Sequence, residues 1–304
     1  MLEAIVLTVI TAATPLLLAG IGELVVERSG VLNLGVEGMM VMGAVAGFAL
    51  TYTTGSPMAG IIGGLLAGTA ISLVFAFVTL SLVANQVASG LALTLFGLGL
   101  SGLLGESFVG EPGLKLPSLY IPGLTDLPFL GRILFGQDFL VYLSFALVAG
   151  VTWFLFRTRG GLVLRAVGDN HVSAHSLGYR VIAVRYLAVL FGGACAGLGG
   201  AYLSIAYTPL WVENMTAGRG WIALALVVFS SWLPWRLAVG AYLFGAVSIL
   251  QLHAQPLGLG VPSQFLSMLP YLVTILVLVI ISTNRRATRL NTPACLGKSF
   301  VPDR

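Results

Sequence analysis

The sequence predicts an all-α, polytopic transmembrane bundle with about 8–10 membrane segments. Hydrophobic residues make up 58% of the 304 positions and charged residues only 9%, whereas a soluble domain is about half apolar and a quarter charged. The hydrophobic residues lie in continuous runs near the ~20 residues that an α-helix needs to cross a bilayer. A membrane β-barrel would instead show short segments of alternating hydrophobicity, so we expect helices.

About nine hydrophobic segments can be placed along the chain. They lie near residues 3–21, 35–52, 58–82, 87–104, 138–156, 184–205, 219–234, 237–254 and 266–283. The first is expected to be retained, because Glu3 stands where a signal peptide would carry basic residues and no good cleavage site follows. We expect all of them to form one transmembrane domain over residues 1–304, with one or two segments broken.

Positive charge predicts how the bundle is oriented. Of the 15 Lys and Arg residues, five lie in residues 157–185, around the connection between the fifth and sixth segments, and five follow the last segment. The positive-inside rule makes both regions cytoplasmic, with a cytoplasmic loop over residues 157–185 and an extracytoplasmic loop over 105–137. Counting back places the N-terminus outside, provided that the first segment crosses completely. The net charge of +4 reflects this topology and predicts no nucleic-acid partner.

Two polar islands interrupt the hydrophobic pattern, "ERSGVLNLGVEGM" at residues 27–39 and "ENMTAGRGWIALA" at 213–225. Unwound backbone at membrane depth lines a cavity or is covered by protein, and paired interruptions in a transporter indicate its substrate pathway. The competing interpretation is a pair of connecting loops. We favour the pathway and predict that it is lined by Asn33, Gly35, Glu37, Gly38, Glu213, Asn214 and Arg219.

We expect three things of the polar residues in the first island. Glu27 and Arg28 would neutralise each other near lipid. Asn33 and Glu37 would share one face if this part is helical, and the Asn33 amide would offer a donor and an acceptor to a solute.

The predicted cytoplasmic loop carries a helix-like piece of its own. Asp169 or Asn170 can cap its start, and Gly178 can end it. His171 and His175 are four residues apart, but no third ligand lies nearby, so we predict no metal site.

Four motifs in order carry a family resemblance over nearly the whole chain. They are "ERSGVLNLGVEGMM", "GLVLRAVGDN…A…LGY", "GGACAGLGGAYLS" and "TAGRGWIALA". Together they resemble permease subunits of bacterial ATP-binding-cassette (ABC) importers of the ribose/branched-chain amino acid group, closest to the nucleoside and simple-sugar branch. Mild departures from the family pattern are Asp169 for Glu, His171 for Pro, Ser173 for Ala and Tyr179 for Ile.

The resemblance implies an assembly in the bacterial plasma (inner) membrane. Its other parts would be a second permease subunit, ABC ATPase subunits on the cytoplasmic face and an extracytoplasmic substrate-binding protein. The two permease subunits would be different chains and would form a heterodimer. Residues 165–178 would form the coupling helix received by the ATPase. The residues expected to carry this coupling are Arg165, Ala166, Gly168, Asp169, Asn170, Ala174 and Gly178.

The sequence predicts a transport subunit and no enzyme. "GKS" at residues 297–299 is no P-loop, because Thr292 stands where the motif needs glycine and no strand precedes it. ATP and Mg²⁺ would therefore bind the partner ATPase, with no cofactor on this chain. The leading interpretation is the permease subunit of an ATP-driven importer for nucleosides or a related small polar solute.

Two other classes of transporter stay open from the residues alone. One is an ion-coupled secondary carrier, with Glu27 or Glu37 as its proton or sodium site, and the other is a solute channel. The helix-like stretch at 165–178 favours the ABC importer, because neither alternative needs to dock an ATPase.

Overall fold

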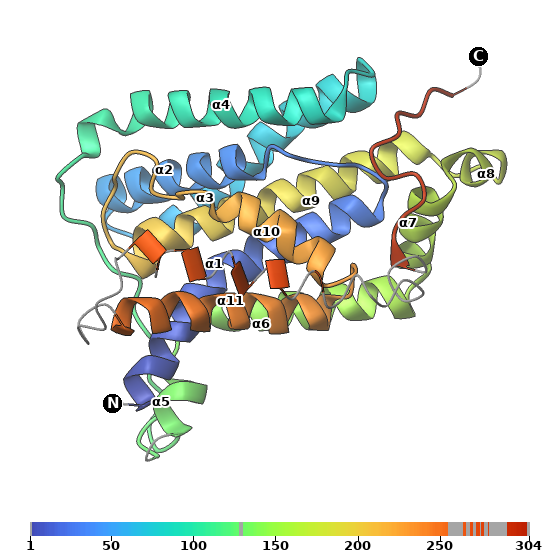
Figure 1. Ribbon diagram of the computed structural model, residues 1–304. Coiled ribbons are helices and arrows are strands. Elements are labelled where there is room, and N and C mark those ends of the chain that lie inside the picture. Colours follow the sequence, from blue (N-terminus) through green and yellow to red (C-terminus); the bar gives the residue numbers. More distant parts are fainter. Residues whose placement is uncertain are drawn as a thin grey trace.

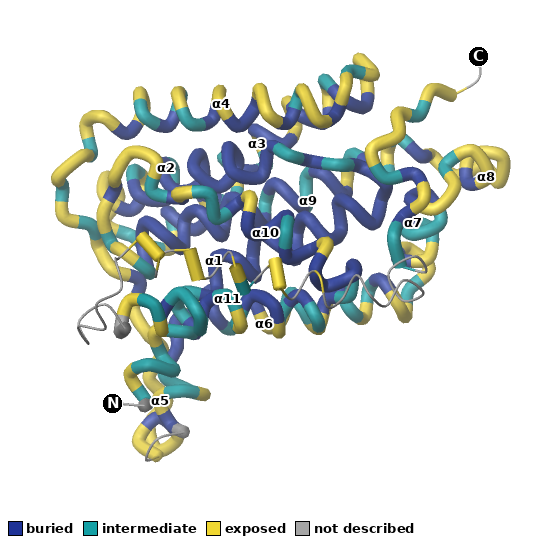
Figure 2. The backbone as a smooth tube through the Cα atoms, viewed as in Figure 1, coloured by how far each residue is buried: buried dark blue, intermediate teal, exposed yellow. Residues whose placement is uncertain are grey.

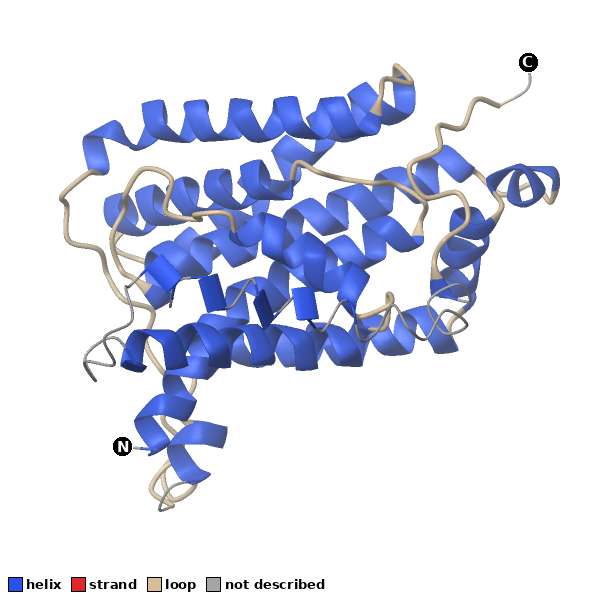
Figure 3. Ribbon diagram, viewed as in Figure 1, coloured by secondary structure: helices blue, strands red, loops and turns tan. Residues whose placement is uncertain are grey.

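The computed structural model describes residues 2–127, 130–254 and 291–302, and short pieces of 264–279. It is an all-α bundle (Figures 1 and 3), and its described residues contain no β-strand beyond two isolated bridges. The helices are α1 (Leu2–Arg28), α2 (Val36–Thr54), α3 (Pro57–Ala76), α4 (Gln86–Gly105), α5 (Leu130–Phe135), α6 (Phe139–Arg157), α7 (Arg159–Asp169), α8 (His171–Ser176), α9 (Val181–Tyr202), α10 (Arg219–Phe229) and α11 (Pro234–Ala254).

Within the part of the chain that the structure describes, seven helical stretches are long and apolar enough to cross a membrane, which confirms the polytopic fold. They are Glu3–Arg28, Val36–Thr54, Pro57–Ser81, Gln86–Phe108, Phe139–Arg157, Val181–Tyr207 and Pro234–Leu252. The segment predicted at 219–234 is only the 11-residue helix α10. At 1.5 Å per residue it rises ~16 Å, about half the hydrocarbon thickness. The segment predicted at 266–283 falls largely outside the described residues.

Close helix packing builds the centre of the bundle, where α9 contacts α1, α2 and α3. Glycines make this approach possible, as the glycine-rich faces in the sequence predict. A Cβ at Gly197 of α9 would overlap the Gly64 carbonyl of α3, and one at Gly200 would overlap the Met40 carbonyl of α2. Figure 2 shows the buried residues gathered there, while α4 exposes its outer side.

The two predicted loops lie at opposite ends of the bundle (Figure 1). The N-terminus and α5 lie at one end, and α7, α8 and the C-terminus lie at the other. Helix α1 contacts both α5 and α7, so it runs the full length of the bundle. The prediction that the N-terminus lies outside requires a first segment of this length. These ends are called the α5 end and the α7 end below.

Candidate translocation site

The first polar island is a true interruption between two membrane helices. Helix α1 ends at Arg28, and the chain turns at Gly30, which has a φ of +88° that suits glycine. The following backbone bonds to α4: the Leu32 amide donates to Gln86 Oε1 at 2.8 Å, and the Thr94 hydroxyl donates to the Leu34 carbonyl at 3.0 Å. Residues 29–35 are called the first break.

Asn33 lies fully buried inside the first break. Its Nδ2 donates to Glu23 Oε2 at 3.2 Å, and its Oδ1 accepts from the Gly35 amide at 2.9 Å. Because α2 begins only at Val36, the expectation that Asn33 and Glu37 share a helical face is wrong. The Asn33 amide bonds within the protein, where it shapes the turn into α2.

Glu37 joins the first break to the second polar island. Its carboxylate accepts from the Thr216 hydroxyl at 2.6 Å, the Gly218 amide at 2.8 Å and the Gly220 amide at 2.6 Å. These donors surround the start of α10, where backbone N–H groups lack helical partners and the helix dipole favours negative charge. Glu37 is therefore the cap of α10, supplied from 180 residues away. Residues 208–218 are called the second break.

The remaining residues of the predicted pathway lie in different surroundings. Gly35 and Gly38 are buried against α4, where a Cβ at Gly38 would lie 2.7 Å from the Leu93 carbonyl oxygen. Glu213 and Asn214 are exposed on the second break. Of the predicted set, Arg219 is the residue that borders a described cavity.

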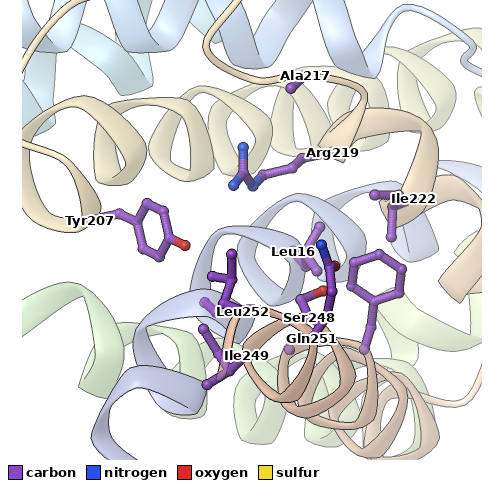
Figure 4. A pocket seen from close by; sticks show the side chains of 12 residues that line it. Leu16, Tyr207, Ala217, Arg219, Ile222, Ser248, Ile249, Gln251 and Leu252 are labelled. Carbon is purple, nitrogen blue, oxygen red and sulfur yellow. The ribbon is translucent and has the colours of Figure 1, made fainter. Parts of the chain in front are cut away.

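That cavity has a volume of about 240 Å³ and lies between α1, α10 and α11 (Figure 4). Its polar side chains are Tyr207, Arg219, Ser248 and Gln251. The Arg219 guanidinium lies 5.5 Å from the centre of the Tyr207 ring, and its Nη1 donates to the Met215 and Thr216 carbonyls at 3.2 and 3.3 Å. The size is just below the ~300–1,000 Å³ of small-molecule pockets.

Sequence reasoning missed several polar residues of this region. Ser248 and Gln251 are three residues apart in a hydrophobic segment, a spacing that places both on one helical face and could have indicated them. Tyr207 ends the π-helical turn Leu203–Tyr207 that follows α9. Glu23, which bonds Asn33, was missed because the predicted segment ends at residue 21, whereas α1 continues to Arg28.

A family model described as "Branched-chain amino acid transport system / permease component" matches residues 5–279. The chain belongs to this permease family. It is 44% identical to the putative glucose ABC transporter permease protein TsgC13 of Haloferax volcanii, covering 96% of this chain and 95% of the relative. It is 34% identical to the nucleoside permease protein NupC of Lactococcus lactis, covering 92% of each. It is 32% identical to the guanosine permease protein NupQ of Bacillus subtilis, covering 91% of each.

The relatives identify this chain as the membrane-spanning permease subunit of an ABC transporter, and they give no support to an ion-coupled carrier. Bacillus subtilis also has a second related permease protein, NupP, which is 23% identical to this chain. The resemblance seen in the four sequence motifs is thereby confirmed.

At the α7 end, the single helix predicted over residues 165–178 is two helices in the permease. Asn170 separates α7 from α8 because its backbone is extended, with a φ of −151° and a ψ of 92°. Its side chain accepts from the Ser173 amide at 3.0 Å and caps α8. Gly178, with a φ of +87°, follows α8.

Two residues expected to approach the ATPase face the interior of the permease. A Cβ at Gly168 would overlap the Arg28 carbonyl oxygen. Ala174 is only 1% exposed and packs in a cluster with Val167 and Val181. The expectation that Gly168 and Ala174 contact the ATPase is therefore wrong, since Gly168 lies on the buried face of α7 and Ala174 on that of α8.

The other residues expected to couple to the ATPase remain accessible. Asp169, Asn170 and Gly178 are exposed, while Ala166 and Arg165 are half-buried. The Arg165 guanidinium lies over the Phe156 ring at 5.2 Å.

Glu27 and Arg28 both bond to Trp232 in the turn between α10 and α11, and Arg28 also bonds to Asn291 of the C-terminal segment. Glu27 accepts from the Trp232 indole nitrogen at 2.6 Å. Arg28 donates to the Trp232 carbonyl at 3.0 and 3.2 Å and to the Asn291 carbonyl at 3.0 Å. The expected neutralising pair is wrong, because successive residues of a helix point about 100° apart. Both side chains instead hold the C-terminal end of α10 in place.

Proposed function

We propose that this permease imports a nucleoside, a simple sugar or a related small polar solute, using ATP hydrolysed by separate ATPase subunits. The observation that carries the proposal is the junction of the two breaks at Glu37, with the Arg219 cavity beside it. The cavity offers a guanidinium, a phenol, a hydroxyl and an amide, which suit the hydroxyl and carbonyl groups of such solutes. The relatives are named for the transport of glucose, nucleosides and guanosine, which supports the same class.

The proposed assembly contains a second permease subunit of different sequence, ATPase subunits and an extracytoplasmic substrate-binding protein. The presence of both NupQ and NupP in one organism supports the pairing of two permeases. In the proposed orientation the α7 end and the C-terminus lie in the cytoplasm, which the basic residues of the 157–185 loop support. ATP and Mg²⁺ belong to the ATPase subunits, and the assembly lies in the plasma membrane.

Helix α8 and the turn after it are the proposed contact with the ATPase. They expose Val172, Leu177 and Tyr179 by 59, 77 and 43%. Three accessible apolar side chains together at the solvent-facing end of a membrane protein favour a protein partner. They take the place of Gly168 and Ala174 as the contacting residues.

Transport by the reconstituted complex tests the proposal. The permease would be placed in proteoliposomes with the proposed partner permease, ATPase and substrate-binding subunits. Uptake of labelled guanosine and glucose would be measured with and without ATP. We expect ATP-dependent uptake that Arg219→Ala lowers at least about tenfold, the loss typical of a charge-assisted hydrogen bond. Arg236→Ala is the control, because Arg236 lies over Trp235 and does not border the cavity. Uptake that needs no ATP and collapses with an ion gradient would contradict the proposal.

A further inference from the structure

The C-terminal segment, residues 291–302, lies against the turn that opens the first break and against α7. The Cys295 amide donates to the Gly168 carbonyl at 2.9 Å, and the Gly297 amide donates to the Gly30 carbonyl at 3.1 Å. Figure 1 shows the segment passing beside α7 at this end of the bundle. The segment therefore bridges α7 and the first break through backbone hydrogen bonds.

Arg185 of α9 connects the same parts through one buried side chain, which is 1% exposed. Its Nε donates to the Ser29 carbonyl at 3.2 Å, and its Nη1 donates to the Lys298 carbonyl at 3.0 Å. Its Nη2 lies 3.1 Å from His171 Nδ1. The planar guanidinium thus joins the first break, the C-terminal segment and α8 through three separate nitrogens whose directions are fixed.

His171 is suited to accept the bond from Arg185. Burial lowers the pKa of His171, and the positive charges of Arg185 and Lys298 lower it further. The imidazole is therefore neutral near pH 7, which leaves Nδ1 free to act as an acceptor.

Phe300 holds the C-terminal segment to α8. Its ring centre lies 5.1 Å from that of His171 and 5.3 Å from that of His175. It also packs on the cluster that contains Ala174. Helix α8 has six residues, too few to be stable without packing, so these contacts help to fix its position.

We propose that the C-terminal segment is part of the coupling device of the permease, with Arg185 and Phe300 as positioning residues that hold α8 against the first break. A displacement of α8 then moves α1 and α2 with it. The claim rests on the proposed function, in which α8 contacts the ATPase, and it extends the device to a segment outside the loop 157–185.

The number of solute molecules taken up per ATP hydrolysed tests this role. In proteoliposomes, Phe300→Ala should lower that ratio roughly three- to tenfold, the effect expected for losing an aromatic contact, while ATP hydrolysis continues. Phe300→Tyr should restore it. Val301→Ala is the matched control, because Val301 is 64% exposed. An unchanged ratio in Phe300→Ala, whether both rates fall together or neither falls, would overturn the proposal.

Alkylation of Cys295 provides a second test that needs no ATPase. The Cys295 side chain is 9% exposed, and its Sγ lies 3.4 Å from the Asp169 carbonyl oxygen. With Cys195→Ala as background, a maleimide should react slowly at Cys295 and much faster after Phe300→Ala or Arg185→Gln. Ser299→Cys, in a Cys295→Ser background, gives the rate for an exposed thiol. Equal rates for Cys295 and Ser299→Cys would overturn the inference alone. Protected Cys295 in a complete complex without ATP-driven uptake would contradict the proposed function and, with it, the coupling role.

Discussion

The two breaks are built differently, although both interrupt membrane helices with polar, glycine-containing sequence. The first break is covered by protein, and the amide of Asn33 and the carboxylate of Glu37 are both bonded to groups of the same chain. The second break exposes Glu213 and Asn214 and leads into α10, whose first residue borders the cavity. Similar sequence patterns thus give internally bonded polar residues in one case and the wall of a cavity in the other.

Removing the Glu37 carboxylate should have the largest effect. Glu37→Leu leaves two backbone amides and the Thr216 hydroxyl without their acceptor, and bonds to a charged group contribute about 1.5–3 kcal/mol each. We expect uptake to be lost and the unfolding temperature of the purified permease to fall by several degrees. Glu37→Gln, which keeps one acceptor oxygen, should give an intermediate result.

The matched control is Glu213→Leu on the second break, where the carboxylate is exposed. Equal loss of stability in Glu37→Leu and Glu213→Leu would contradict the difference between the two breaks.

Packing of the start of α2 against α4 should be nearly as sensitive. Gly38→Ala places a Cβ 2.7 Å from the Leu93 carbonyl oxygen, and overpacking of this kind costs about 1–3 kcal/mol. We expect less folded permease in the membrane, measured by fluorescence-detected size exclusion. Gly99→Ala of α4 meets no atom within 4 Å and should leave the yield unchanged. Similar yields for the two variants would show that α2 and α4 are less closely packed.

Asn33→Leu should act on folding and leave solute recognition intact. The change leaves the Gly35 amide without its acceptor, at a cost of about 1–3 kcal/mol. We expect a lower amount of permease but an unchanged KM for uptake, determined at matched protein levels. Arg219→Ala should raise KM instead. A KM raised by Asn33→Leu to the same extent would return Asn33 to the substrate pathway.

The smallest effect is expected at the exposed part of the second break. Glu213→Gln should change the free energy of unfolding by less than about 0.5 kcal/mol, as is usual for surface positions. Uptake should stay within about a factor of two of that of the unchanged permease, because 0.5 kcal/mol corresponds to roughly this factor. A large loss of uptake at normal protein levels would place Glu213 in a functional contact outside this chain.

Local pattern was enough to predict the fold class, both interruptions and the helix end at Gly178, and it narrowed the cap of α8 to Asp169 or Asn170. These features depend on hydrophobic runs and on backbone preferences of single residues. The bond between Glu37 and α10 could not be predicted, because it joins residues about 180 positions apart. The burial of Gly168 and Ala174 inside the permease could not be predicted either, because small residues suit a partner surface and a close internal contact equally well.

Protection of a cysteine in the cavity is the most direct test of the central claim, that the solute passes beside Arg219 at the junction of the two breaks. Ser248→Cys would be made in a background of Cys195→Ala and Cys295→Ser, and its alkylation followed in the complete complex during ATP hydrolysis. We predict that the transported solute slows alkylation at Ser248→Cys and that alkylation blocks uptake, while the rate at exposed Ser299→Cys stays constant. Full uptake after complete alkylation, with no protection by solute, would contradict the account.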